Sequence, residues 1–239
     1  LLTVALTDDG ERAADLTAGV QAAGGAGSRL DVRRPDGSSI EYLVGLPGRH
    51  NAANALAVVG AAHVLGVADE SVALSLRAFN GVGRRLELKG EAGGVVVLDD
   101  YGHHPTAIAR TLEAVRARYP GRRLWAVYEP LTYHRTARML DAFADALAVA
   151  DAIAIADIWP GRDRDMTITS SAALAEAVSR RRPAPAVAPG SVERTADYLA
   201  GEVRAGDVVL VMGGGRSYVI AERLLELLSA QDGGDVRRD

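Results

Sequence analysis

The feature that most constrains the fold is a regular alternation of apolar runs and helical segments that begins near residue 90. Five short runs are almost continuous in apolar residues, as strands buried on both faces of a parallel sheet are. Each is followed by a segment whose apolar residues recur at helical spacing. In chain order the segments are "VVVLDD", "PTAIARTLEAVRARY", "RLWAVYE", "TARMLDAFADALAVA", "AIAIADI", "SAALAEAVSRR", "AVA", "SVERTADYLAGEVR", "DVVLVMG" and "SYVIAERLLELL". The alternation predicts right-handed βαβ units in an α/β fold, with a Rossmann-like, doubly wound, mostly parallel sheet.

A different pattern precedes the alternation. Short apolar runs separated by Gly-rich and Asp-rich breaks, such as "RPDGS", are typical of strands and tight turns. From Gly48 onward, "HNAANALAVVGAAHVLG" and "DESVALSLRAFN" have helical periodicity, and the second begins with an acidic N-cap. We therefore expect a smaller α+β region over residues 1–82, a second domain over residues 83–230 and a disordered polar tail over residues 231–239.

Composition limits the possible partners. The net charge of −4, without a basic run interleaved with aromatics, argues against nucleic acid. No apolar stretch reaches the ~20 residues of a membrane helix, so membrane insertion is not expected. The absence of cysteine excludes disulfides and thiolate metal sites and favours a reducing, cytoplasmic location. The only lysine, Lys89, does not follow the glycines of a P-loop.

Polar residues follow four of the predicted strands, at the end where ligands bind in open parallel sheets. Because the carboxyl ends of parallel strands meet at one edge, these residues predict a cleft there. They are Asp99, Asp100, Tyr101, His103 and His104 after the first strand, Glu129, Tyr133, His134 and Arg135 after the second, Asp157 and the "GRDRD" loop after the third, and "GGGR" after the last.

The stretch "DDYGHHP" allows several interpretations. Asp99 and Asp100 could simply end a strand, with Pro105 in the first turn of the next helix. Two Asp and two His could bind a divalent metal, as in a metal-dependent hydrolase. An acid pair of the Walker B type would require the P-loop that the chain lacks. Finally, a carboxylate could bind a ribose hydroxyl while imidazoles bind an anionic substrate.

Two further motifs carry polar groups that suit a nucleotide. In "GRHNAAN", His50, Asn51 and Asn54 share a helix face, either as a cap and solvent-exposed side chains or as hydrogen-bonding groups for a nucleotide. In "GVGRRLEL", Arg84 and Arg85 are either a solvated pair or ligands for phosphate oxygens. The turn "MGGGRSY" could present backbone amides to an anion.

Taken in order and at this spacing, the motifs "LPGRHNAANALAVVGAA", "FNGVGRRLEL", "LDDYGHHPTAI", "YEPLTYHRT", "ADIWPGRDRD" and "VVLVMGGG" resemble the Mur ligase family, and within it the ligases that add L-alanine to UDP-N-acetylmuramate in peptidoglycan biosynthesis. The resemblance implies three domains. Residues 1–82 would be the end of the central ATPase domain, and residues 83–230 the C-terminal domain. The UDP-binding domain, the P-loop and most Mg²⁺ ligands would lie in an N-terminal part outside this chain, and the chain alone would be inactive.

The resemblance also implies a chemistry and a set of site residues. The family uses ATP and Mg²⁺: the substrate carboxylate becomes an acyl phosphate, and the amino group of L-alanine then displaces phosphate. By motif, ATP would contact His50, Asn51, Asn54, Arg84, Arg85 and Asp100, and the substrates would contact Tyr101, His103, His104, Tyr133, His134 and Arg135. Arg85 and His103 are the candidate catalytic residues, and no metal ligand is assigned within the chain.

The chain departs from the family pattern in two of its motifs. Where the family usually has "QPHRYSRT", this chain has "EPLTYHRT", so that Glu129 replaces Gln and Leu131 replaces His, with His134 as a possible compensation. Arg216 stands where the family has an acid. These changes leave two alternatives open: a related ligase that recycles murein tripeptide onto UDP-N-acetylmuramate, and a non-catalytic binding module of the same fold.

Overall fold

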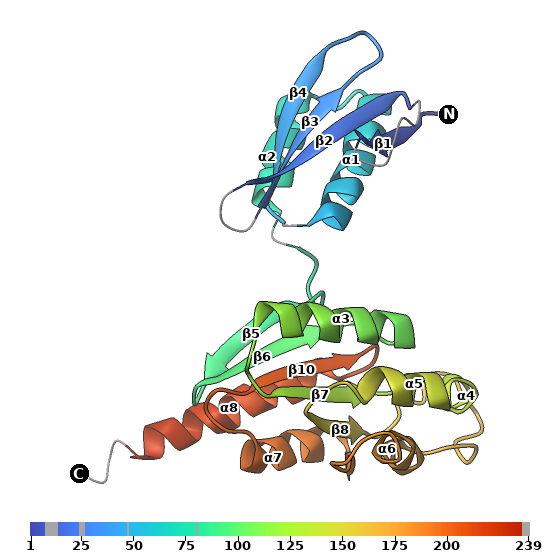
Figure 1. Cartoon of the computed structure of the whole chain (residues 1–239), viewed down its shortest axis with the longest axis vertical. Coiled ribbons are helices and arrows are strands. Elements are labelled where there is room, and N and C mark those ends of the chain that lie inside the picture. The colour runs from blue at the N-terminus through green and yellow to red at the C-terminus, as the bar shows by residue number, and fades with distance from the viewer. Residues whose placement is uncertain (8–13, 24–26, 47, 80, 236–239) are drawn as a thin grey trace. The chain divides into compact units, whose positions relative to one another are not determined.

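The computed structural model describes residues 1–7, 14–23, 27–46, 48–79 and 81–235 (Figure 1). The chain divides into two compact units, Leu1–Val82 and Gly83–Asp239, and each is described by itself.

The first unit is a four-stranded sheet covered by two helices. The strand order is β1-β2-β3-β4, with β1 parallel to β2 and the other neighbours antiparallel. The elements are β1 (Val4–Leu6), β2 (Leu16–Ala23), β3 (Gly27–Arg33), β4 (Ser39–Val44), α1 (Arg49–Val64) and α2 (Asp69–Ala78). The turn predicted at "RPDGS" joins β3 to β4, and Gly37 there has a φ of 82°. The unit has its own core, formed by apolar residues of the sheet and both helices.

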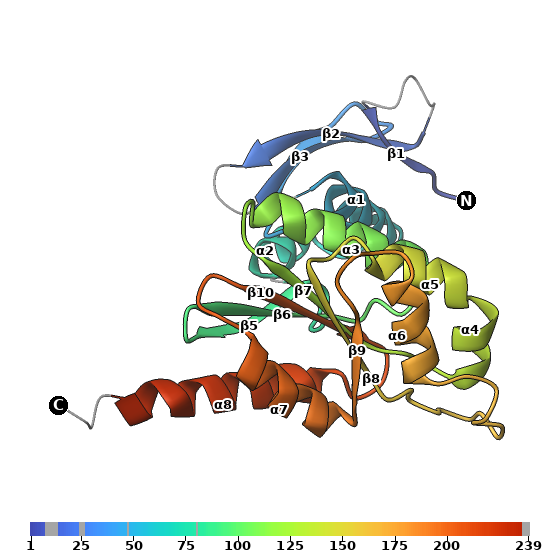
Figure 2. The same ribbon diagram turned by 60° about the horizontal axis from the view of Figure 1, so that its bottom comes forward.

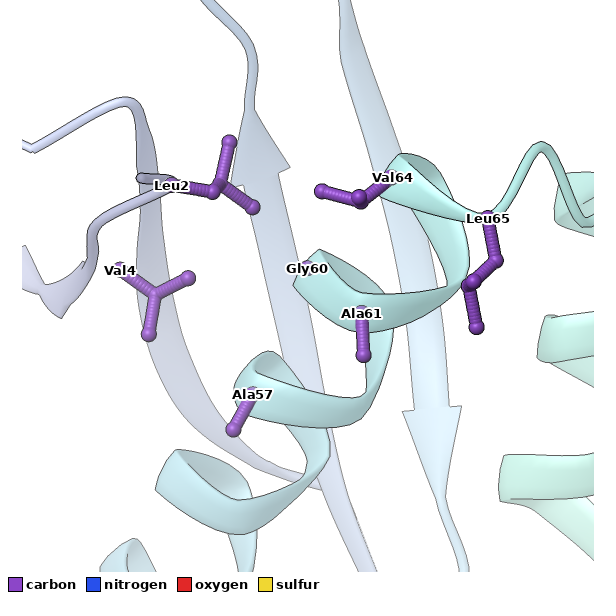
Figure 3. A pocket seen from close by; sticks show the side chains of 7 residues that line it. All are labelled: Leu2, Val4, Ala57, Gly60, Ala61, Val64 and Leu65. Carbon is purple, nitrogen blue, oxygen red and sulfur yellow. The ribbon is translucent and has the colours of Figure 1, made fainter.

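A hollow on this unit is lined by apolar residues (Figure 3). It lies between the β1 region and the outer face of α1, and its lining consists of Leu2, Val4, Ala57, Gly60, Ala61, Val64 and Leu65. Because no polar side chain faces it, the hollow has nothing to orient a nucleotide.

The second unit is a six-stranded, mostly parallel sheet, which confirms the predicted Rossmann-like fold. The strand order is β5-β6-β10-β7-β8-β9, and only the edge strand β5 is antiparallel to its neighbour. The strands are β5 (Glu87–Ala92), β6 (Val95–Asp100), β7 (Leu124–Glu129), β8 (Ala152–Ala156), β9 (Val187–Gly190) and β10 (Val208–Gly213).

Helices cover both faces of this sheet (Figure 2). On one face, α3 (Pro105–Arg118), α5 (Leu140–Leu147) and α6 (Ser171–Ser179) pack their apolar residues against the strands. On the other face, α7 (Val192–Glu202) and α8 (Tyr218–Asp235) do the same. The strands are apolar almost throughout because both of their faces are buried.

The structure differs from the sequence-based expectation in three elements. The strand β5 was not expected, and the segment "TARMLDAFADALAVA" belongs to two helices, α4 (Tyr133–Arg138) and α5, which meet at Met139. The helix α8 continues to Asp235, into the tail expected to be disordered from residue 231, since no proline stops it. Residues 236–239 lie outside the described residues. Within the described ranges, no helix is both long and apolar enough to cross a membrane.

Candidate functional site

The carboxyl ends of β6, β10, β7 and β8 lie side by side in the sheet of the second unit. The register pairs Asp100 of β6 with Met212 of β10, and Gly213 of β10 with Glu129 of β7. The glycine-rich loop, defined here as residues 213–217, therefore lies between the acids of β6 and Glu129. This strand order therefore brings the polar residues that follow β6, β7 and β10 to the same carboxyl edge of the sheet, as the sequence predicted.

Arg84 lies at the start of the second unit, and its side chain extends along the carboxyl edge of the sheet from β6 to the glycine-rich loop. Its Nε donates to Asp99 Oδ2 at 3.1 Å, and its Nη1 donates to Gly215 O at 3.3 Å. Its Nη2 donates to Gly213 O and to Ser217 Oγ, both at 2.7 Å. The guanidinium carbon lies 5.3 Å from the centre of the Tyr101 ring and 5.2 Å from that of Tyr218. Arg84 thus joins the beginning of the unit to β6 and to the glycine-rich loop.

The turn of residues 84–87 presents Arg85 to solvent. Arg84 and Leu86 have left-handed φ values of 61° and 49°, which are costly for residues with a Cβ. Carboxylates hold the turn: Arg84 N donates to Glu87 Oε2 at 2.7 Å, and Leu86 N donates to Asp100 Oδ2 at 2.8 Å. Arg85 itself is exposed, and its guanidinium carbon lies 5.8 Å from the centre of the Tyr101 ring.

Asp100 is buried and supports the backbone around it. Besides Leu86 N, it accepts a hydrogen bond on Oδ1 from Gly102 N at 2.7 Å and a long one from Thr111 Oγ1 at 3.5 Å. A carboxylate offers about four lone pairs, so one acceptor position on Oδ2 remains for a ligand hydroxyl.

Glu129 occupies the position under the glycine-rich loop. Its side chain is 3% exposed, and Oε2 has no hydrogen-bond partner among the described residues. Burial raises the pKa of Glu129 to about 7, and the backbone amides of Ser217 and Arg216, with the charge of Arg84, oppose that rise only in part. The sequence analysis suggested that the backbone amides of this turn could bind an external anion. The amides of Arg216 and Ser217 instead face the Glu129 carboxylate of the chain itself.

Asp99 is the second buried carboxylate beside Arg84. It is fully buried, and its Oδ1 has no hydrogen-bond partner within the described part of the chain. Burial raises the pKa of Asp99, while the Arg84 guanidinium acts in the opposite direction.

The aromatic residues after β6 have distinct positions. His103 Nδ1 lies 2.9 Å from Tyr101 O, and the two rings meet edge to face at 5.1 Å. A Cβ on Gly214 would lie 3.6 Å from His103 Cγ, so His103 borders the glycine-rich loop. His104 is exposed and caps α3, since its Nδ1 accepts from Thr106 N at 3.3 Å.

The residues after β7 start α4. Tyr133, His134 and Arg135 form its first turn, and His134 is tied to Asp163 through its backbone N at 3.0 Å and through Nδ1 at 3.2 Å. Leu131 packs on Gly214, with Cδ2 at 3.0 Å from a Cβ built there. His134 thus contacts the loop after β8, whereas Leu131 contacts the glycine-rich loop.

The three nucleotide candidates of the first unit lie at the start of α1. The N-cap is Gly48, which makes no side-chain cap, so Asn51 is not the capping residue. Asn51 is half-buried and Asn54 is exposed one turn later. His50 is the second residue of α1, and its side chain lies outside the described part.

Sequence reasoning missed three side chains at the edge. Trp159 packs against Gly215, where an added Cβ would lie 2.7 Å from Trp159 Cγ. Tyr218 stacks on Arg84, and Ser217 accepts from it. All three lie in or next to the segments that follow predicted strands, Trp159 directly after "AIAIADI" and Ser217 and Tyr218 directly after "GGGR", and this position is the signal that could have found them. No group of three His, Asp or Glu that could hold a metal ion occurs among the described residues.

Comparison with known families and proteins gives a consistent result. The family model described as "Mur ligase, glutamate ligase domain" matches residues 84–215. The UDP-N-acetylmuramate–L-alanine ligase of Alkaliphilus metalliredigens is 39% identical over 77% of this chain and 39% of that protein. The corresponding ligase of Roseiflexus sp. is 40% identical over 84% of this chain and 42% of that protein. The chain thus spans less than half the length of the curated relatives it matches.

Solved structures resemble the chain over almost its whole length. A murein peptide ligase from Psychrobacter arcticus matches with a TM-score of 0.69 and 28% identity, over 95% of this chain and 46% of that one. A UDP-N-acetylmuramate-alanine ligase from Thermotoga maritima also matches with a TM-score of 0.69, at 21% identity, over 96% of this chain and 48% of that one. The second match shows a shared fold.

Proposed function

Because the chain belongs to the Mur ligase family, we propose that it is the C-terminal part of an ATP-dependent ligase that joins L-alanine to UDP-N-acetylmuramate in the cytoplasm. The observation that carries this proposal is the 39–40% identity to ligases of that name over 77–84% of the chain. The polar carboxyl edge of the second unit supplies groups suited to a nucleotide and an anionic substrate. As a part of such a ligase, the chain alone is expected to lack activity.

The phosphate contact is assigned to Arg85. Its side chain is exposed, and no ion pair of Arg85 is found among the described residues, so its donors are available to phosphate oxygens. Phosphoryl transfer depends mainly on positioning and on stabilising the developing charge, which a forked cation performs well. ATP supplies the energy by converting the substrate carboxylate to an acyl phosphate, whose carbonyl carbon the amino group then attacks.

The ribose contact is assigned to Asp100 and the base contacts to Asn51 and Asn54. The remaining lone pair of Asp100 Oδ2 can accept a ribose hydroxyl while the other lone pairs continue to hold the turn. Asn51 and Asn54 each carry a donor and an acceptor, as base edges require, and His50 is adjacent to them in sequence. Mg²⁺ belongs to the proposal as the counter-ion of ATP, with its ligands outside this chain.

The substrates are assigned to the side chains after β6 and β7. Tyr101, His103 and Arg135 offer hydrogen-bond donors to the carboxylate that is activated, with Tyr133 next to Arg135 in the chain. The structural roles of His104 as a helix cap and of His134 as a partner of Asp163 make both weaker candidates for direct contact.

A second candidate is a ligase that attaches a murein tripeptide to UDP-N-acetylmuramate. It is favoured by the 28% identity to the Psychrobacter arcticus murein peptide ligase and by Leu131, which replaces a histidine of the usual pattern. A non-catalytic binding module of the same fold is the third.

The complete gene product that contains this chain tests all three. ADP release is measured with UDP-N-acetylmuramate and, separately, L-alanine, glycine, L-serine and the murein tripeptide. Release that depends on L-alanine supports the proposal, and release that depends on the tripeptide selects the second candidate. Binding of UDP-N-acetylmuramate without ADP release under any condition would favour the module.

A further inference from the structure

Arg84 and Arg85 are adjacent in sequence but differ in what they contact. Four N–H groups of Arg84 point at acceptors of the same unit, on Asp99, Gly213, Gly215 and Ser217. A guanidinium has five N–H donors, so Arg84 has almost none left for a ligand. A phosphate would have to displace hydrogen bonds that are already made.

The surroundings of Arg84 reinforce this difference. Its side chain is 22% exposed and lies between the rings of Tyr101 and Tyr218. The buried Asp99 requires a positive neighbour, because an unpaired charge in the interior is strongly destabilising. The positive charge of Arg84 therefore compensates the buried Asp99 carboxylate rather than a ligand.

The contacts of Arg84 also fix its own backbone. Tyr101 N donates to Arg84 O, and Arg84 N donates to Glu87 Oε2, so main chain and side chain are both held. The left-handed conformations at Arg84 and Leu86 persist only where surrounding contacts enforce them. With these two residues fixed, the intervening Arg85 is left exposed, and it shares the Tyr101 ring with Arg84 but is hydrogen-bonded to none of the four acceptors of Arg84.

We propose that Arg84 is a positioning residue that locks the glycine-rich loop to the turn of residues 84–87, so that the ligand phosphate meets Arg85 and not Arg84. The identity of the ligand rests on the proposed function, whereas the lock is a property of this chain alone. A lysine could retain the charge of Arg84 but could not reach four acceptors in a fork. Arg84→Lys is therefore the decisive variant, and it avoids the buried uncompensated Asp99 that Arg84→Ala would leave.

The lock is tested by amide hydrogen exchange on the 239-residue chain. In Arg84→Lys, the N–H groups of Leu86 and Tyr101 in and beside the turn, and of Ile220, which donates to Ser217 O of the glycine-rich loop, should exchange about tenfold faster, while Val209 and Leu210 in the middle of β10 keep their rates. Arg110→Ala, which removes an exposed arginine on α3, is the matched control and should change none of them. Unchanged exchange at the loop, or an equal increase in β10, would overturn the lock.

The phosphate assignment is tested by kinetics of the complete gene product. Arg84→Lys should lower kcat with little change in the KM for ATP, and Arg85→Ala should raise that KM, with partial recovery in Arg85→Lys. A raised KM in Arg84→Ala that Arg84→Lys restores would make Arg84 a direct phosphate ligand and overturn the proposal. Absence of ligase activity in the unaltered protein would instead contradict the proposed function, and the exchange experiment would still decide the lock.

Discussion

Glu129 and Asp99 are buried carboxylates on the strands that flank β10, and the charge of Arg84 lowers the pKa of each. Burial raises the pKa of each acid more than the charge of Arg84 lowers it. Burial therefore favours the protonated form of one acid. Glu129, with a pKa of about 7, is the group that takes up this proton near neutral pH.

The Glu129→Gln variant should be more stable than the unaltered chain at alkaline pH. The folded-state pKa of Glu129 is raised from 4.5 to about 7. As pH rises, Glu129 therefore ionises in the unfolded state before it ionises in the folded state, and this ionisation stabilises the unfolded state. The free energy of unfolding should then fall as pH rises from 4.5 to 7 and stay low above 7, by at most about 3 kcal/mol. Gln keeps the shape without the charge and should remove most of this fall.

Urea unfolding of both proteins at pH 5, 6, 7 and 8 measures the difference. Glu226→Gln, at an exposed position of α8, is the control because it removes a carboxylate far less enclosed than Glu129. Equal pH dependence in the Glu129 variant and the unaltered chain would contradict the assignment of the proton to Glu129.

Arg85→Ala in the complete gene product should raise the KM for ATP by roughly ten- to a hundredfold, the usual loss for a charge-assisted bond to phosphate. Steady-state ADP release at varied ATP concentration gives this value. The side chain is exposed, so the melting temperature should not change. An unchanged KM would remove Arg85 from the nucleotide site.

At the scale of elements, the glycine-rich loop has its sequence because three neighbours pack against it. A Cβ at Gly213 would lie 2.8 Å from Glu129 O, one at Gly214 would lie 3.0 Å from Leu131 Cδ2, and one at Gly215 would lie 2.7 Å from Trp159 Cγ. The glycines let the loop approach β7 and the loop after β8. They do not open an empty anion site, since Glu129 lies beneath them.

Gly215→Ala should destabilise the second unit by about 1–3 kcal/mol, since the added methyl group must displace Trp159 or the Glu129 carboxylate. Gly201→Ala is the matched control: an added Cβ there meets nothing within 4 Å, and Gly201 is exposed in α7. The control should stabilise the chain by up to about 1 kcal/mol. Thermal unfolding of both variants measures whether the free energy of unfolding falls in Gly215→Ala and rises in Gly201→Ala. Equal effects of the two substitutions would mean that the loop tolerates the methyl group.

Elements were predictable where burial imposed a pattern. The run "VVVL" of β6 and the run "VVLVM" of β10 are apolar because helices cover both faces. The strand β5 was not predicted because its residues are half-buried or exposed and include Lys89 and Gly90, so its sequence has no apolar pattern. The break at Met139 between α4 and α5 also left no proline or glycine as a signal.

At the scale of the whole molecule, each unit closes a core of its own. Leu30 lies fully buried in the core of the first unit and Leu210 in that of the second. Leu30→Ala and Leu210→Ala should each cost about 2–5 kcal/mol. Calorimetry should then show each substitution lowering the transition of its own unit, and a single transition that both lower equally would contradict separate cores.

The sequence by itself determined the type of sheet and the residues that follow its strands. Alternating buried runs and amphipathic helices admit few other folds, and polar residues after such runs must lie at the carboxyl edge. The motif order also led to the family that the comparisons show.

Only the tertiary structure decided which of these residues meet. The last strand, β10, inserts between β6 and β7, and this order places Gly213 beside Glu129 and brings Arg84 within reach of Gly215. No local pattern encodes that insertion, because it depends on how the helices pack on the two faces. For the same reason, the different roles proposed for Arg84 and Arg85 could not be predicted from two adjacent arginines in the sequence. The difference arises because Arg84 is hydrogen-bonded to Gly213, Gly215 and Ser217, which are distant in the chain.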